Sequence, residues 1–385
     1  MKKRSGILCI ILAASILFLT ASCSLRTPGP TKDYSTEAVE LSSGGRTKYH
    51  FSLLNNTEKH AYNNILSSVK DFVEKIEIPV LSEESLNKVY SAILYDNPDL
   101  FFLQKTCSAE TYADVAYFKP QYSMSLSDYT AMIGKCTAVA DEIIKKTSEC
   151  TTDFDKERVV HDEIISLCSY SDKDDNAYKN SIYGVLVYRS ASCEGYSKTA
   201  KYLFDLLGIE SYVITGSSYG PSGETQPHMW NIINLEGNYY HLDLTWDDPV
   251  TESSLPTIFY TYFNVTDEVI GKTHFDFDNA NLCLQTEGYF FNHTEMSFES
   301  FGRSAKEKVA LFAADIINKG SNGFQICFSS ESAFKEAADN LFEKQEIYNL
   351  LESIESLSAV DFATDRVSYV LSENYNIIEV IIETV

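Results

Sequence analysis

Three short segments of the sequence carry a thiol, an imidazole and a carboxylate, in that order along the chain. Cys193 stands in Ser-Cys-Glu-Gly-Tyr, His228 in His-Met-Trp-Asn, and Asp243 in His-Leu-Asp-Leu-Thr-Trp-Asp-Asp-Pro. A cysteine that works with a histidine, which is itself oriented by a carboxylate, is the arrangement of nucleophilic thiol enzymes. Each of the three residues alone has an ordinary structural explanation, so the prediction depends on their combination.

The residues that follow Cys193 predict a helix. Apolar side chains recur at helical spacing from Tyr196 to Leu207, and Gly208 is a typical helix end. A helix that begins at Cys193 would hold the thiol at its N-terminus, where the helix dipole and a nearby imidazolium favour the thiolate. The backbone N–H of Cys193 would also be a natural oxyanion donor. Gly195 would remove a side chain where a substrate or a strand approaches.

His228 and Asp243 fall on two predicted strands, 228–235 and 238–245, joined at Glu236-Gly237. With a two-residue turn, Leu235 pairs with Asn238, and His228 and Asp243 become diagonal neighbours on one face, about 7–8 Å apart at Cα. A three-residue turn would place them on opposite faces. The carboxylate could therefore hold the imidazole only if the turn contains an even number of residues.

Several motifs together resemble the transglutaminase-like superfamily, in the branch that is common in bacterial surface proteins. The resemblance is strong over about residues 153–275 and looser from residue 49 onward, and Met229 stands where the family usually has alanine. The motifs that carry it are Leu94-Tyr95-Asp96-Asn97-Pro98, His161-Asp162, Tyr183-Gly184-Val185-Leu186, Cys193-Glu194-Gly195-Tyr196, His228-Met229-Trp230-Asn231, Tyr240 to Pro249, and Tyr262 to Asp267.

The resemblance implies an α+β, papain-like core in which a helix carries the cysteine and an antiparallel sheet carries the histidine and aspartate. Cys193 would be the nucleophile, His228 the general base and then acid, Asp243 the orienting group, and Tyr183 a second oxyanion donor. The expected function is a cysteine acyltransferase or peptidase that acts on protein or peptide amide bonds through an acyl-enzyme, without a cofactor. Lysine-rich or cell-wall-associated proteins are candidate substrates. The alternative is a surface-binding module that uses the same cleft without catalysis.

The N-terminus predicts export. Lys2, Lys3 and Arg4 precede an apolar run from Ile7 to Leu19, which is too short to span a bilayer as a helix. Leu19-Thr20-Ala21-Ser22-Cys23 resembles the lipobox of bacterial lipoproteins, with Thr20 where leucine is usual. We therefore expect lipidation at Cys23 and a protein anchored on the outer face of a bacterial membrane. Plain secretion and a retained signal anchor are the alternatives.

The composition suggests several domains and limits the classes of partner. We expect a signal peptide (1–22), a flexible tether (23–48), a mainly helical region (49–150), a transglutaminase-like catalytic domain (151–285) and a small C-terminal α+β domain (286–385). The net charge of −24 argues against nucleic-acid binding.

A metal centre is a minor alternative in this sequence. The cysteines beyond the N-terminal segment are widely spaced, and no CxxC pair suggests a zinc site. A zinc site from Cys193, His228 and His241 lacks a closely spaced ligand pair, so no metal is expected. His241 is more simply a packed strand residue, Trp246 a wall of the cleft or core, and Asp247-Asp248-Pro249 the cap of a turn.

Overall fold

The computed structural model describes residues 18–19, 39–41, 48–112, 114–171, 176–220, 223–249 and 257–384. The expected lipidation site Cys23, and almost all of the expected signal peptide and tether, lie outside these residues. The chain divides into two compact units, Met1–Tyr129 and Thr130–Val385. The boundaries expected at 150/151 and 285/286 therefore stay predictions. Among the described residues, no helix combines the length and apolar character that crossing a membrane requires.

The first unit contains a sheet in addition to helices, so the expectation of a mainly helical region was incomplete. Its central strands β3 and β4 are antiparallel, and the sheet order is β1-β3-β4-β2. Ala116, Phe118 and Pro120 are the buried positions of β4 and alternate along it, which is the pattern of a strand with one face on the core. The elements of this unit are β1 (Phe18–Leu19), α1 (Tyr49–Ser52), α2 (Asn56–Val69), β2 (Ile76–Ile78), α3 (Glu83–Asp96), β3 (Leu103–Thr111) and β4 (Ala116–Tyr122).

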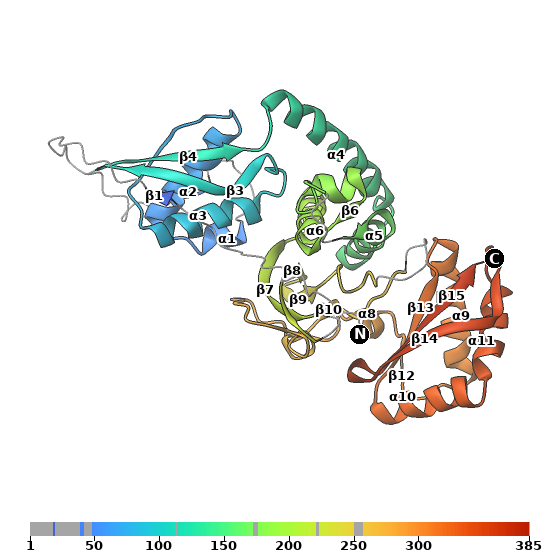
Figure 1. The fold of residues 1–385 in the computed structure, drawn as a ribbon. Helices are drawn as coiled ribbons and strands as arrows, with labels where there is room; N and C mark the ends of the chain where they lie inside the picture. Colours follow the sequence, from blue (N-terminus) through green and yellow to red (C-terminus); the bar gives the residue numbers. More distant parts are fainter. Residues whose placement is uncertain are drawn as a thin grey trace, which may run out of the picture. The chain divides into compact units, whose positions relative to one another are not determined.

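The second unit begins with helices beside a five-stranded sheet, in the order β10-β9-β8-β7-β11. The helix α6 packs on β7 and β8, and α5 packs on α6 (Figure 1). The mixture of helices and a separate antiparallel sheet agrees with the expected α+β class. The elements are α4 (Leu126–Lys146), α5 (Asp153–Leu167), β5 (Ser169–Tyr170), the π-helix η1 (Gly184–Tyr188), β6 (Ser190–Ala191), α6 (Cys193–Leu207), β7 (Ser211–Tyr219), β8 (Thr225–Leu235), β9 (Asn238–Leu242), β10 (Phe263–Val265), α7 (Asp267–Ile270) and β11 (His274–Phe275).

The ends of α5 and α6 follow local chemistry. The Thr152 hydroxyl accepts from the backbone N–H of Asp155 at 3.1 Å, so Thr152 caps the N-terminus of α5. Gly208 ends α6 in the left-handed conformation, at φ 73°, which a residue without Cβ adopts at little cost. The predicted helix over Cys193–Leu207 is thereby confirmed at both ends.

The hairpin between β8 and β9 has the predicted two-residue turn. Leu235 pairs with Asn238, and Glu236 and Gly237 both have positive φ, as a tight hairpin turn requires. The second strand is shorter than expected, since β9 ends at Leu242 instead of at residue 245. Asp243 leaves the ladder because its side chain closes the following turn.

The C-terminal part of the second unit is a four-stranded sheet, in the order β12-β13-β15-β14, with helices (Figure 1). The Gln325 side chain of β13 joins this sheet to the preceding segment, because it accepts from Tyr260 N at 2.8 Å and donates to the Thr261 hydroxyl at 2.7 Å. The elements are α8 (Phe290–His293), β12 (Ser297–Phe298), α9 (Arg303–Asn318), β13 (Gly323–Phe328), α10 (Glu331–Ala338), the π-helix η2 (Asp339–Glu343), α11 (Glu346–Glu355), β14 (Phe362–Ser372), the 3-10 turn η3 (Glu373–Tyr375) and β15 (Ile377–Thr384).

Candidate active site

The Cys193 thiol lies at the first residue of α6 and is partly exposed. Ser192 occupies the N-cap position, yet its side chain does not cap the helix; its hydroxyl donates to the Asn180 side-chain oxygen at 2.6 Å. The first N–H groups of a helix have no partner within the helix and carry the positive end of its dipole. This end of α6 therefore suits a thiolate at Cys193 and an anionic oxygen nearby.

Gly195 is needed for packing. A Cβ at this position would lie 2.4 Å from the Lys179 carbonyl oxygen and 2.8 Å from the Ala191 Cβ. The group that approaches Gly195 is therefore the loop before α6, and not the substrate or strand that the sequence suggested. This close approach holds the first turn of α6, and hence Cys193, against that loop.

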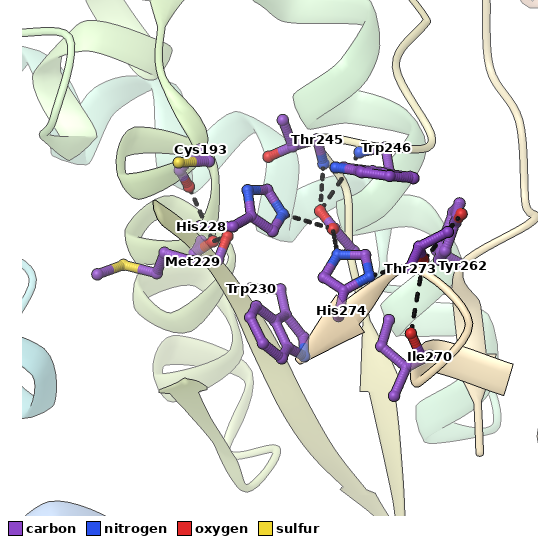
Figure 2. Close-up of polar contacts among 12 residues, drawn as sticks. Cys193, His228, Met229, Trp230, Thr245, Trp246, Tyr262, Ile270, Thr273 and His274 are labelled. Atoms are coloured by element: carbon purple, nitrogen blue, oxygen red, sulfur yellow. Dashed lines mark hydrogen bonds and ion pairs between the residues drawn. The ribbon is translucent and has the colours of Figure 1, made fainter. Parts of the chain in front are cut away.

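The His228 imidazole and the Asp243 carboxylate form a buried pair, with Nε2 of His228 2.7 Å from Oδ2 of Asp243. Burial opposes a charge on His228, but the charge and hydrogen bond of Asp243 outweigh it and raise the pKa of His228 to about 10; the Cys193 thiol adds to the rise. Burial also raises the pKa of Asp243, but His228 overcomes this and holds it well below its usual range. The pair is therefore an imidazolium against a carboxylate. Figure 2 shows His228 between Cys193 and His274.

The Asp243 carboxylate is held from several sides. Its Oδ1 accepts from the backbone N–H groups of Thr245 at 3.0 Å and Trp246 at 3.3 Å. Its Oδ2 contacts a second histidine, with Nε2 of His274 at 3.0 Å. Because an ionised carboxylate only accepts hydrogen bonds, both histidines direct an N–H at the same oxygen. Sequence reasoning missed His274, which lies 31 residues after Asp243 on a two-residue strand and in no motif.

His241 does not join this cluster and has the packed-strand role. Its Nδ1 accepts from the Trp230 indole N–H at 2.9 Å, and its Nε2 lies 2.8 Å from the Asp267 carboxylate. Burial lowers the pKa of His241, although Asp267 partly opposes the shift. Trp246 does lie at the site, where its ring centre is 4.8 Å from that of His274 and 6.3 Å from that of His228.

Two groups of described side chains converge closely enough to hold a metal ion: His228 with Asp243 and His274, and His241 with Asp267 and Cys283. The set of Cys193, His228 and His241 is not among them. In the second group, the Trp230 N–H fixes the lone pair of His241 at Nδ1, so the neutral ring carries its hydrogen at Nε2, where a metal would have to bind. In the first group, the Nε2 atoms of His228 and His274 already hydrogen-bond Asp243. A metal bound there would occupy His228, which would then be unable to act as the base. We therefore assign no metal to either group.

Tyr183 precedes η1, and its ring packs edge-on against Tyr178 at 5.0 Å between centres. This packing fits a core aromatic as well as an oxyanion donor. The oxyanion role stays a prediction.

A second buried histidine–carboxylate pair lies behind the site, where the sequence suggested only a turn cap. His161 on α5 has Nε2 3.3 Å from Asp247 and Nδ1 2.9 Å from Asp162; these acids overcome burial and raise the pKa of His161 to about 9. Burial raises the pKa of Asp247 to about 6, although His161 opposes the rise. The neighbouring Asp248 accepts from the Tyr196 hydroxyl at 2.5 Å, and burial raises its pKa to about 7.

Comparison with known proteins agrees with this arrangement at the level of the superfamily. Residues 137–244 match the family model of the transglutaminase-like superfamily. The human Kyphoscoliosis peptidase is 26% identical over an alignment of 174 residues that covers 41% of this chain, and the chain spans about a quarter (25%) of that relative's length. A solved structure of a TGase has 13% identity and a TM-score of 0.28, covering 47% of this chain and 53% of that one. A candidate cysteine protease from Cytophaga hutchinsonii has 13% identity and a TM-score of 0.25, covering 34% and 52%.

The site is of the thiol–imidazole–carboxylate class, on an α+β core. Residues 137–244 are the part of the chain that is transglutaminase-like by this match.

Proposed function

We propose that this chain is a cysteine enzyme in which Cys193, His228 and Asp243 cleave or exchange amide bonds of proteins or peptides through an acyl-enzyme. The observation that carries the proposal is the buried His228–Asp243 contact of 2.7 Å, beside a partly exposed thiol at a helix N-terminus. An imidazole held by a carboxylate next to a thiol is what activates such a nucleophile.

The proposed reaction balances through two proton transfers by His228. The Cys193 thiolate attacks the amide carbonyl carbon, and the Cys193 backbone N–H stabilises the resulting oxyanion. As the C–N bond breaks, the His228 imidazolium gives its proton to the leaving amine, and a thioester remains on sulfur. His228 then takes a proton from water or from a second amine, which attacks the thioester and returns the thiolate. Asp243 orients the ring and stabilises its charge throughout.

Hydrolysis and transfer share the acyl-enzyme and differ only in the second nucleophile. The test is incubation of the full chain with glutamine- and lysine-containing peptides and a tagged primary amine, followed by mass spectrometry. Amine incorporation or cross-linking identifies transfer, whereas deamidation or cleavage identifies hydrolysis. Cys193→Ala is the matched control and must abolish the product. If neither the peptides nor the protein changes, the proposal fails and the alternative of a non-catalytic binding module replaces it.

We also propose that the protein is exported and anchored by lipid at Cys23. The basic head, short apolar run and small residues before Cys23 support this location. A strongly acidic protein at a surface would suit lysine-rich or cell-wall-associated substrates. Cys23→Ala should release the protein from membranes in cell fractionation. Recovery of the wild-type protein in the medium with unmodified Cys23 would contradict the anchor.

A further inference from the structure

The loop that carries His274 contacts the turn between β14 and β15, about 100 residues further along the chain. Lys272 Nζ donates to the Asn374 carbonyl oxygen at 2.8 Å and lies 5.1 Å from the centre of the Tyr375 ring. The Tyr375 ring packs edge-on against Tyr262 at 5.5 Å between centres. The C-terminal sheet therefore reaches the immediate surroundings of the candidate active site.

The contact continues inward as a chain of hydrogen bonds. The Tyr375 hydroxyl lies 2.9 Å from the Tyr262 hydroxyl and 3.5 Å from the Thr273 hydroxyl. The Tyr262 hydroxyl lies 3.3 Å from that of Thr273, which is 2.9 Å from Nδ1 of His274. Nε2 of His274 is in turn 3.0 Å from Asp243 (Figure 2).

The donors and acceptors in this series of hydrogen bonds can all be directed toward Asp243. Because ionised Asp243 only accepts, His274 donates from Nε2, and in the tautomer with its single hydrogen at Nε2 the Nδ1 atom accepts. The one hydrogen of the Thr273 hydroxyl has two acceptors within reach, Nδ1 of His274 at 2.9 Å and the Ile270 carbonyl oxygen at 3.4 Å. When it points at the nearer Nδ1, the Thr273 oxygen is left to accept from a tyrosine hydroxyl. Tyr375 supplies the outermost hydroxyl, and it comes from the C-terminal sheet. This series of hydrogen bonds thus favours the Nε2–H tautomer of His274, which donates to Asp243.

We propose that the C-terminal region 286–385 completes the active site, with Tyr375 as a positioning residue that acts through Thr273 and His274 on the Asp243 carboxylate. This inference rests on the proposed function, because it assigns a task to Asp243 that matters only if His228 activates Cys193. It gives the C-terminal sheet a part in the reaction.

The test measures the rate at which iodoacetamide alkylates Cys193 at about pH 6, using the full chain. Tyr375→Phe removes one oxygen and keeps the ring on Tyr262 and Lys272, so the fold should persist. We expect a fall of about three- to tenfold, the effect of one hydrogen bond. The matched control is Tyr369→Phe, on β14, where the ring stacks on Phe342 at 3.5 Å; it should react like wild type.

Variants of His274 separate positioning from packing. His274→Ala should slow alkylation by at least as much as Tyr375→Phe, whereas His274→Gln keeps an N–H donor at a similar reach and should restore most of the rate. Equal rates for wild type, Tyr375→Phe and His274→Ala, with Cys193 still selectively reactive, would overturn this inference and leave the proposed function standing. If wild-type Cys193 shows no selectivity at all, the proposed function itself fails, and the two failures are thereby distinguished.

Discussion

The buried pairs His228–Asp243 and His161–Asp247 of the second unit look alike but differ in how the imidazole is used. In His228–Asp243, one ring nitrogen faces the carboxylate, and the ring also interacts with Cys193. In His161–Asp247, both ring nitrogens face acids, since Asp162 takes the other one. An imidazole that keeps one nitrogen for a nucleophile can transfer a proton, while one that is bonded to acids on both sides can only hold elements together. The His161 pair fastens α5 to the segment after Asp243.

Replacing His228 should reduce activity more than any other substitution in the two histidine–carboxylate pairs. A small loss of activity would contradict the difference between the two pairs. His228→Ala removes the proposed base, and we expect the acyl product to fall by at least about 1000-fold. The preference of iodoacetamide for Cys193 at about pH 6 should vanish as well. The measurements are product formation by mass spectrometry and site-resolved alkylation, with unfolding in urea as the control for folding. Activity within tenfold of wild type would contradict the role of His228.

Replacing His161 should act on stability instead of chemistry. His161→Ala leaves the Asp247 carboxylate buried without its cationic partner, and removing one member of a buried pair costs about 3–5 kcal/mol. Urea unfolding should show this loss, while Cys193 in the folded protein still reacts selectively. The double variant His161→Ala/Asp247→Asn should recover part of the stability, because the fully buried Asp247 no longer carries an unpaired charge. If His161→Ala abolished selectivity in a folded protein, the two pairs would not be separate in function.

Replacing Asp243 should have an intermediate effect on the thiol. Asp243→Ala should slow alkylation of Cys193 at about pH 6 by about 10- to 100-fold, the value of a charge-assisted hydrogen bond, and less than His228→Ala does. The internal control is Cys150, which is also partly exposed and whose pKa is raised by burial and by Asp155. Its alkylation should be slow in all variants. A faster reaction at Cys150 than at wild-type Cys193 would argue that exposure alone decides reactivity.

The smallest effect concerns Asp248, which accepts from Tyr196 beside the His161 pair. Its pKa of about 7 in the folded protein is above the ordinary value of about 3.9, so the folded state binds the proton more tightly. The stability that this group contributes is full below about pH 4 and is lost as pH rises through about 7. The free energy of unfolding in urea should be measured for wild type and Asp248→Asn at pH 5 and at pH 8. The variant should be more stable relative to wild type at pH 8 than it is at pH 5. An equal difference at the two pH values would contradict the raised pKa.

Local pattern predicted the elements that carry Cys193 and His228. The spacing of apolar residues and Gly208 set the length of α6, and Glu236-Gly237 set the hairpin register, because each depends on residues adjacent in sequence. The end of β9 was wrong, since Asp243 prefers to cap a turn through Thr245 and Trp246, which period-two alternation does not reveal.

Contacts between distant segments could not be predicted. His274 meets Asp243, Tyr375 meets Tyr262, and His161 meets Asp247 only in the folded protein. No spacing in the sequence links the two members of any of these contacts. Two separate histidines on one carboxylate oxygen leave no periodic pattern. The sheet of the first unit was likewise only partly anticipated, because β3 and β4 form one strand-like stretch in composition and the turn between them has no strong glycine or proline marker.

Ser197, one turn into α6, fixes the distance between the helix that carries Cys193 and the strand that carries His228. Its hydroxyl lies 2.8 Å from the carbonyl oxygen of Cys193 and 2.8 Å from that of Met229, next to His228, and its one hydrogen is shared between them. The helix that bears the sulfur and the strand that bears the imidazole are thus separated by a spacer one side chain long. A bulky acyl group could separate the helix from the strand only by breaking the Ser197 hydrogen bonds. We therefore expect such a group to lie on the solvent-exposed side of the Cys193 thiol, which is the open side. Attempts to change substrate size are therefore best directed at that open side, with Ser197 left in place.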